Sequence, residues 1–178
     1  RPNDSVKNFL KNLGMEKEIY DHVFTSGEAA LKYIKNNLSY KAFFHIGPSR
    51  DFDLLKGFEK MKSKNIEKSE YILCTGLFDN HNDDLEYYKS LFENSLEKKM
   101  ICTNPDLIVD RGNTREYCAG SIARLFDQIG GEVEYFGKPY AKIYNQATKV
   151  ENKKILCIGD NLNTDIRGAN LQCYDSLL

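Results

Sequence analysis

A chain of 178 residues, of which 41% are hydrophobic, is long enough to bury a hydrophobic core of ordinary size. Its 25 Lys and Arg residues nearly balance its 26 Asp and Glu residues, and no block of basic residues provides the positive surface that binds a nucleic-acid backbone. A nucleic-acid partner is therefore disfavoured. A membrane partner is disfavoured too, because no apolar stretch reaches the roughly 20 residues that a transmembrane helix needs.

The five cysteines are spread along the chain without any Cys-x-x-Cys pair, at positions 74, 102, 118, 157 and 173. We predict reduced thiols, most of them in the core, rather than a disulfide framework or a zinc site. No charged-then-apolar signal sequence opens the chain, so the expected location is the cytoplasm. The sequence starts at Arg1 without Met and stops within an apolar run at Leu178, and we expect both ends to be truncated.

The first predicted element is an amphipathic helix that starts at Asp4 and stops at Gly14. A short strand is predicted over 20–24. The segment Thr25-Ser26-Gly27-Glu28 then fits a capping box that opens a second helix, which runs to Leu38.

Strands and helices alternate through the rest of the chain. Strands are predicted at 42–46, 71–74, 100–102, 133–136 and 155–158, and helices at 52–61, 85–96, 122–129 and 139–150. This order indicates right-handed βαβ units and an α/β fold with a parallel sheet covered by helices on both faces.

The segment from Ile155 to Asn170 reads as a buried strand, a tight acidic loop that contains Asp160, and the start of a helix that contains Asp165. Ligands of open parallel sheets bind outside the carboxyl ends of the strands, and a carboxylate placed there can hold Mg²⁺. The alternative is structural, because Asp is also common in turns and at helix N-termini.

Lys138 follows the strand predicted at 133–136 and precedes Pro139. It could be an ordinary exposed lysine. As a compact positive charge beside Asp160 it could instead neutralise a phosphoryl group. We expect Lys138 and Asp160 to lie at neighbouring strand tips, where together they would hold a metal-bound phosphate.

With these two motifs the sequence resembles the haloacid dehalogenase superfamily of phosphatases, in particular the class IIA enzymes with a large α/β cap. Gly137-Lys138-Pro139 resembles the third motif of the superfamily, and Gly159-Asp160 with Thr164-Asp165-Ile166 resembles the fourth. Thr103-Asn104-Pro105-Asp106, followed by Gly120-Ser121, is similar to a stretch found in caps of this class.

The resemblance implies a Rossmann-like core of residues 1–25 and 132–178, with an inserted α/β cap of residues 26–131. It implies that Lys138 steadies the nucleophile and the phosphoryl group, that Asp160 binds Mg²⁺ directly and that Asp165 supports this metal site. Cap residues 104–111 would line the substrate entrance. Among them we select Asn104, Asp106 and Arg111, although Arg111 could be a surface residue near Asp110, and Asn104 and Asp106 could instead fix a loop.

Two motifs that the resemblance requires are missing. The attacking carboxylate should belong to an Asp-x-Asp at the end of the first core strand, and the single Asp-x-Asp here, Asp51-Phe52-Asp53, is predicted to open a helix in the cap. The Ser or Thr of the second motif would precede Arg1. Cys173 also stands where relatives usually have Gly.

The sequence therefore predicts a Mg²⁺-dependent phosphatase that hydrolyses a small phosphorylated metabolite through an aspartyl phosphate. A homo-oligomer is compatible with the sequence. We expect no turnover by these 178 residues alone. The alternative is a catalytically silent relative that binds a phosphorylated ligand or a protein. A receiver-like signalling domain is disfavoured, because such compact domains do not accept an insertion of about a hundred residues.

Overall fold

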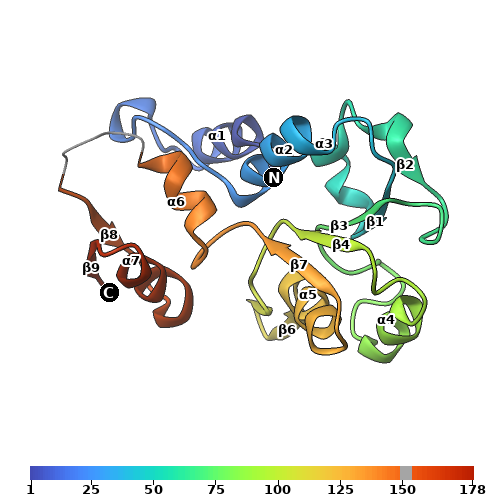
Figure 1. The fold of residues 1–178 in the computed structure, drawn as a ribbon. Coiled ribbons are helices and arrows are strands. Elements are labelled where there is room, and N and C mark those ends of the chain that lie inside the picture. Colours follow the sequence, from blue (N-terminus) through green and yellow to red (C-terminus); the bar gives the residue numbers. More distant parts are fainter. Residues whose placement is uncertain (149–153) are drawn as a thin grey trace.

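A parallel sheet forms the centre of the computed structural model, which describes residues 1–148 and 154–178. The sheet has five strands in the order β2-β1-β3-β4-β7, and all neighbours are parallel (Figure 1). The strands are β1 (Phe43–Ile46), β2 (Lys62–Ser63), β3 (Tyr71–Cys74), β4 (Lys99–Cys102) and β7 (Glu132–Tyr135). Four of them confirm strands predicted from the sequence, whereas the short edge strand β2 was not predicted.

Helices cover both faces of this sheet (Figure 1). On one face Ile72 and Cys74 pack in a cluster with α4 (Leu85–Phe92) and α5 (Ala119–Gln128). On the other face Tyr71 and Leu73 pack with α2 (Ser26–Asn37) and α3 (Phe52–Leu55). Burial on both sides explains why the central strands are mostly apolar instead of alternating between apolar and polar residues. The predicted α/β architecture is confirmed.

The N-terminal segment departs from the prediction at one element. α1 (Asn3–Asn12) is present, but a short 3-10 helix, η1 (Lys17–Ile19), and extended chain replace the strand predicted at 20–24. The capping box forms only in part. Thr25 Oγ1 accepts a hydrogen bond from Glu28 N at 3.1 Å, while Glu28 accepts one from Asn3 N instead of returning to Thr25.

The helix predicted at 52–61 was wrong in its length. A 3-10 turn, η2 (Ser49–Asp51), leads into α3, which stops after Leu55, and a separate 3-10 turn, η3 (Glu59–Met61), follows. Gly57 separates the two with a φ of 90°, a conformation that a helix excludes and that Gly adopts readily.

A hairpin that the sequence did not predict follows β4. Its strands β5 (Ile108–Arg111) and β6 (Thr114–Tyr117) pair antiparallel across a turn at Gly112, whose φ is 60°. Most residues of these two strands are exposed, including Ile108 and Tyr117, so the segment lacks the alternation of buried apolar and exposed polar residues by which strands are recognised.

The last part of the chain forms a second, smaller sheet (Figure 1). β8 (Leu156–Ile158) pairs in parallel with β9 (Asp175–Leu177), and a π-helix, η4 (Leu162–Ile166), followed by α7 (Arg167–Leu171) connects them. α6 (Ala141–Ala147) is shorter than the helix predicted at 139–150, whose last residues lie outside the described chain. Within the described residues, no helix has the length and apolar character needed to span a membrane.

Candidate active site

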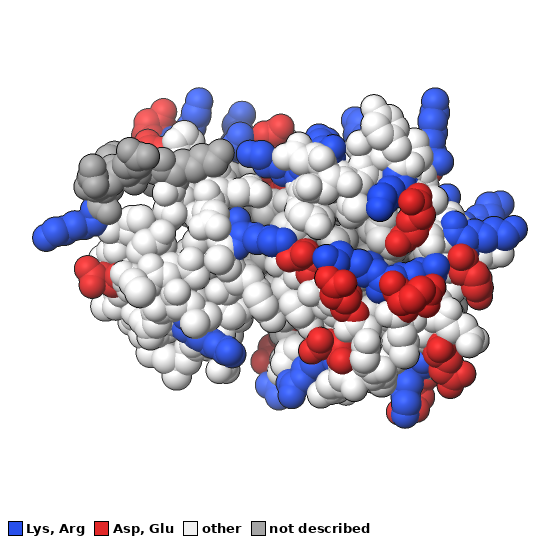
Figure 2. All heavy atoms as spheres, in the orientation of Figure 1, with Lys and Arg blue, Asp and Glu red and all other residues white. Residues whose placement is uncertain are grey.

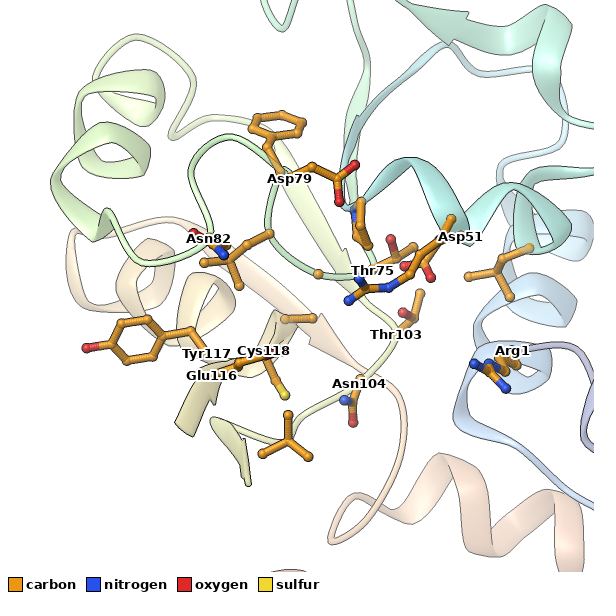
Figure 3. A pocket seen from close by; sticks show the side chains of 18 of the residues that line it. Arg1, Asp51, Thr75, Asp79, Asn82, Thr103, Asn104, Glu116, Tyr117 and Cys118 are labelled. Carbon is orange, nitrogen blue, oxygen red and sulfur yellow. The ribbon is translucent and has the colours of Figure 1, made fainter. Parts of the chain in front are cut away.

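The main cavity lies at the carboxyl ends of the central strands and has a volume of about 800 Å³. The loops after β1, β3 and β4 form its walls, and the β5–β6 hairpin and the start of α2 close its sides (Figure 3). This is the edge at which parallel sheets bind ligands, because every strand there ends in a loop that can place a polar side chain.

Lys138 follows the last strand of the large sheet, and its side chain contacts the segment that connects the two strands of the small sheet. It stands three residues after β7, beyond Gly137, whose φ of 119° turns the chain away from the strand. The Lys138 ammonium donates to Asp165 Oδ1, which belongs to the π-helix after β8. The lysine side chain keeps about half of its surface exposed, whereas only 10% of the Asp165 side chain is exposed.

Asp165 is held by the turn that precedes it. Its Oδ2 accepts a hydrogen bond from Asn161 N at 3.2 Å, and Asn161 Oδ1 in turn accepts from the backbone of Asn163 and Thr164. A Cβ on Gly159 would lie 2.3 Å from Asp165 Cγ, so only glycine fits at that position. These contacts fix a buried carboxylate that faces the ammonium.

Asp160 is exposed in the loop directly after β8. No hydrogen bond or ion pair to the rest of the described chain engages its carboxylate, so both of its oxygens can accept a ligand. The structure therefore places Lys138, Asp160 and Asp165 in one neighbourhood, but in two different chemical settings: a paired, buried carboxylate and a free, exposed one.

The expectation that Lys138 and Asp160 follow neighbouring strands was wrong. β7 belongs to the five-stranded sheet and β8 to the two-stranded one. The ion pair with Asp165 brings the two motifs together across the sheets, and the turn at Gly137 makes this reach possible.

The three residues selected for substrate contact lie in different settings. Asn104 and Arg111 line the cavity, whereas Asp106 is not among its lining residues. Asn104 Oδ1 accepts weakly from Asp106 N at 3.4 Å, which is the loop-fixing contact considered as the alternative. Arg111 pairs with Glu116 at 3.3 Å across the hairpin, not with Asp110, which Arg115 binds through two nitrogens.

Sequence reasoning missed the polar residues that follow β1 and β3. Arg50 and Asp51 after β1, and Thr75 and Asp79 after β3, all line the cavity. Asp51 was considered only as a nucleophile and rejected, and the structure does place it before α3 and not at a strand end. The rule that selected Asp160, a polar residue after a predicted strand, would also have selected Thr75.

Two side chains in the cavity wall have shifted pKa values. Hydrogen bonds from Ser49 N and Oγ to Asp79 Oδ2, at 2.9 and 2.7 Å, lower the pKa of that carboxyl. Burial raises the pKa of the Cys118 thiol. Asp79 is therefore ionised and tied to the loop after β1, and Cys118 stays protonated as a weak donor in the wall.

Comparison with known proteins gives one family match and several structural matches. The HAD-hydrolase-like family model matches residues 135–178, which contain Lys138, Asp160 and Asp165. No curated protein matches the chain in sequence. The structural matches are haloacid dehalogenase-like hydrolases and phosphatases.

A haloacid dehalogenase-like hydrolase from Brucella suis 1330 is 32% identical, with a TM-score of 0.85 over 99% of this chain and 68% of that chain. A thermostable NPPase from Geobacillus stearothermophilus is 25% identical, with a TM-score of 0.73 over 100% of this chain and 72% of that one. A p-nitrophenyl phosphatase from Archaeoglobus fulgidus shares the fold at 18% identity, with a TM-score of 0.76, over 100% of this chain and 69% of that one. The likeness to the Brucella protein in both sequence and fold extends over almost all of these residues, and the chain therefore belongs to the haloacid dehalogenase-like hydrolase family.

Proposed function

We propose that this chain is part of a Mg²⁺-dependent phosphatase that hydrolyses a small phosphorylated metabolite through an aspartyl phosphate. The observation that supports this most directly is the Lys138–Asp165 ion pair beside the free carboxylate of Asp160. A positive charge next to an available hard oxygen ligand suits a metal-bound phosphoryl group. The comparisons support the same chemistry, since similar structures include a p-nitrophenyl phosphatase and a glycerol phosphate phosphatase.

The donor set of the described residues fits Mg²⁺. This ion takes one or two protein carboxylates and completes its shell with water and phosphate oxygens. The described chain has no group of three His, Cys, Asp or Glu residues that could enclose a metal ion by itself. Asp160 would hold the ion directly, and Asp165, already bonded to Lys138 and to Asn161 N, would orient the loop that carries Asp160. When bound, Mg²⁺ would neutralise charge on the phosphoryl oxygens.

In this proposal Lys138 binds a phosphoryl oxygen and keeps the attacking carboxylate ionised. Its half-exposed ammonium has three donors, of which Asp165 uses one. The loop after β4, with Asn104, would line the path of the substrate, together with Arg111 from the hairpin. Asp106 would act through the loop backbone, because its N–H donates to Asn104.

We also propose a division into a catalytic core and an inserted cap. The sequence suggested a boundary at residue 132, but this would separate β7 from β4, its hydrogen-bonded neighbour. We therefore place the second boundary after β7, at Gly137, so that the five-stranded sheet belongs to the cap. The unit of α6, β8, η4, α7 and β9 then belongs to the core with α1.

The test is hydrolysis of 4-nitrophenyl phosphate. We expect the full-length gene product to hydrolyse it with Mg²⁺, to lose activity with EDTA and to regain it when Mg²⁺ is restored. Lys138→Met and Asp160→Asn should each lower kcat by at least 100-fold. For the 178 residues alone we expect no turnover. A full-length protein that binds Mg²⁺ but hydrolyses no phosphate ester would contradict the proposal.

That result would favour the second candidate, a catalytically silent relative that binds a phosphorylated ligand or a protein. One observation points this way: the single Asp-x-Asp of these 178 residues, Asp51-Phe52-Asp53, lies at the start of α3 and not directly at the end of a strand. Calorimetry with a phosphate ester, combined with an assay for released inorganic phosphate, separates the two candidates, because the silent relative binds the ester and releases no phosphate.

A further inference from the structure

Two threonines occupy equivalent positions just beyond the ends of β3 and β4. Thr75 N donates to Ile46 O at 2.8 Å, and Thr103 N donates to Cys74 O at 3.0 Å, so that each residue extends the ladder of the sheet by one step. Cys74 and Cys102 are partners in the register, which makes Thr75 and Thr103 neighbours. Both line the cavity, and Figure 3 shows them close to Asp51.

The Thr103 hydroxyl has no hydrogen-bond partner among the described residues, although only 5% of the residue is exposed. Among the described residues, Ser95 Oγ is the one fully buried side-chain polar atom without a partner, so the Thr103 oxygen keeps some access to solvent. The cavity provides this access, because Thr103 is part of the cavity wall. The hydroxyl is therefore available to a ligand.

The Thr75 hydroxyl forms a hydrogen bond with His45. His45 lies on β1 and is 6% exposed, and its Nε2 is 2.9 Å from Thr75 Oγ1. The fit is tight, since a Cβ on Gly47 would lie 2.0 Å from Thr75 Oγ1 and 2.7 Å from His45 Nε2. His45 itself is not part of the wall of this cavity.

The imidazole is neutral at neutral pH, because burial, reinforced by the nearby Lys62 charge, lowers the pKa of His45 to about 4. A neutral imidazole has one N–H and one lone pair. If Nε2 donates, the Thr75 hydrogen is free to point into the cavity. If Nε2 accepts, the oxygen lone pairs of Thr75 are free. Either tautomer leaves one hydrogen-bonding function for a ligand.

Asp51, which lies beside the two threonines in Figure 3, supplies an acceptor to the same part of the cavity. In contrast with Asp79, which Ser49 engages, Asp51 has no side-chain hydrogen bond or ion pair to any described residue. Two hydroxyls and one carboxylate together match a ligand that both donates and accepts hydrogen bonds at adjacent atoms. Neighbouring hydroxyl groups have this property, and an alkyl or nitrophenyl group lacks it.

The cavity also borders the proposed phosphoryl site. A Cβ on Gly137 would lie 3.0 Å from the Cβ of Ser26, which lines the cavity, and 2.6 Å from Pro105 Cδ, next to Asn104. The residue after Gly137 is Lys138. A phosphate ester bound at Lys138 would therefore have this cavity as a neighbour.

We propose that Thr75, Thr103 and Asp51 form a subsite for the hydroxyl groups of the leaving group, and that His45 is a positioning residue that orients the Thr75 hydroxyl. The inference rests on the proposed function in one respect, the orientation of the ester with its phosphate at Lys138. It names hydroxyl-bearing phosphate esters as the preferred substrates.

The test is a binding comparison that needs no turnover, carried out on the 178-residue chain. Glycerol 3-phosphate and propyl phosphate have the same carbon skeleton and differ in two hydroxyls. We expect glycerol 3-phosphate to bind about five- to tenfold more tightly, as one or two net hydrogen bonds predict, and to shift the methyl resonances of Thr75 and Thr103. The ring nitrogen resonances of His45 should shift as well, although the ring lies outside the cavity.

Variants separate the subsite from a purely structural role. Thr75→Val and Thr103→Val should each reduce the preference for glycerol 3-phosphate, whereas Thr75→Ser should retain it. His45→Phe should also reduce the preference, because the Thr75 hydroxyl loses its fixed orientation. Thr114→Val is the matched control, since Thr114 is exposed on β6 and is not among the cavity residues.

Equal dissociation constants for the two esters, or binding that leaves the Thr75 and Thr103 resonances unchanged, would overturn the subsite. Failure of the proposed function has a different signature. In that case the chain still binds glycerol 3-phosphate more tightly than propyl phosphate, and the valine variants still lose this preference. The full-length protein, however, hydrolyses neither ester.

Discussion

Cys173 is the one non-glycine residue of the described chain with a positive φ, at 58°. It closes the turn between α7 and β9, where its N–H donates to Asn170 O. For residues other than glycine this left-handed conformation costs about 1 kcal/mol or more. The sequence had indicated an irregularity here, because relatives of this family usually have Gly at this position.

Cys173→Gly should therefore stabilise the chain, by up to about 1 kcal/mol after the greater flexibility of the unfolded glycine is subtracted. The measurement is the free energy of unfolding in urea. Cys173→Ala is the matched control, because it removes the thiol and keeps the strained conformation. If both variants have the same stability, the thiol and not the backbone explains the difference from the parent chain.

His45 gives the fold a pH dependence. Its pKa of about 4 in the folded chain lies below the ordinary value of 6.5. Between these two values the unfolded chain binds a proton that the folded chain does not, so the free energy of unfolding falls as the pH is lowered from 6.5 to 4. The full effect of this one residue is roughly 3 kcal/mol.

In His45→Gln this contribution is absent, and the stability of the variant should vary less with pH over that interval than the stability of the parent. Urea unfolding at pH 7, 5.5 and 4.5 measures it. His22→Gln is the control, because His22 is an exposed histidine. Parallel pH profiles for the parent and for His45→Gln would show that His45 is protonated in the folded chain.

At the scale of elements, the ion pair between Lys138 and Asp165 connects the turn after β7 to the π-helix after β8. Replacing Lys138 with Met keeps the length of the side chain and leaves a buried carboxylate with Asn161 N as its remaining donor. We expect a loss of about 1–2 kcal/mol in the free energy of unfolding, because half of the lysine is exposed and solvent screens the pair.

Adding Asp165→Asn to Lys138→Met should cost less than the sum of the two single changes, because the carboxylate that lacks its partner is then gone. Lys7→Met is the control, since Lys7 pairs with Asp4 on an exposed face of α1 and such pairs contribute little. If the two changes are strictly additive, the contact does not couple the two sheets.

How much of this could be predicted from the sequence depends on whether the signal was local. The apolar runs of β1, β3 and β4 are buried on both faces, so composition alone identified them. The capping hydroxyl of Thr25 was also evident, since its signal spans four residues. Lys138, Asp160 and Asp165 were selected by their motifs, and their roles in the site stay predictions.

The parts that were missed depend on tertiary contacts. The segment 20–24 has the residues of a strand but no neighbour with which to pair. The residues of β7 and β8 do not indicate which sheet each strand joins, because its pairing partners lie far away in the chain. The His45–Thr75 contact joins residues 30 positions apart, so no local pattern could reveal it.

At the scale of the whole molecule, the charges are unevenly distributed. Figure 2 shows Lys, Arg, Asp and Glu interspersed over the part that contains the large sheet, and few of them on the visible face of the part with β8 and β9. Three apolar residues on these two strands and Leu178, which follows β9, are strongly exposed: Leu156 at 58%, Ile158 at 72%, Leu177 at 54% and Leu178 at 69%. Exposed apolar patches of this kind promote association.

We therefore expect the 178-residue chain to associate with itself as its concentration rises, through the exposed row on β8 and β9. Ile158→Lys should shift the sedimentation profile toward monomer, because the ammonium would have to lose its hydration in any contact between two such rows. The control is Tyr40→Lys, at an apolar residue that is 89% exposed but lies away from these strands. If Tyr40→Lys suppresses association as well as Ile158→Lys does, a general gain in charge is responsible. If the parent chain stays monomeric at every concentration, the row does not bind a second copy.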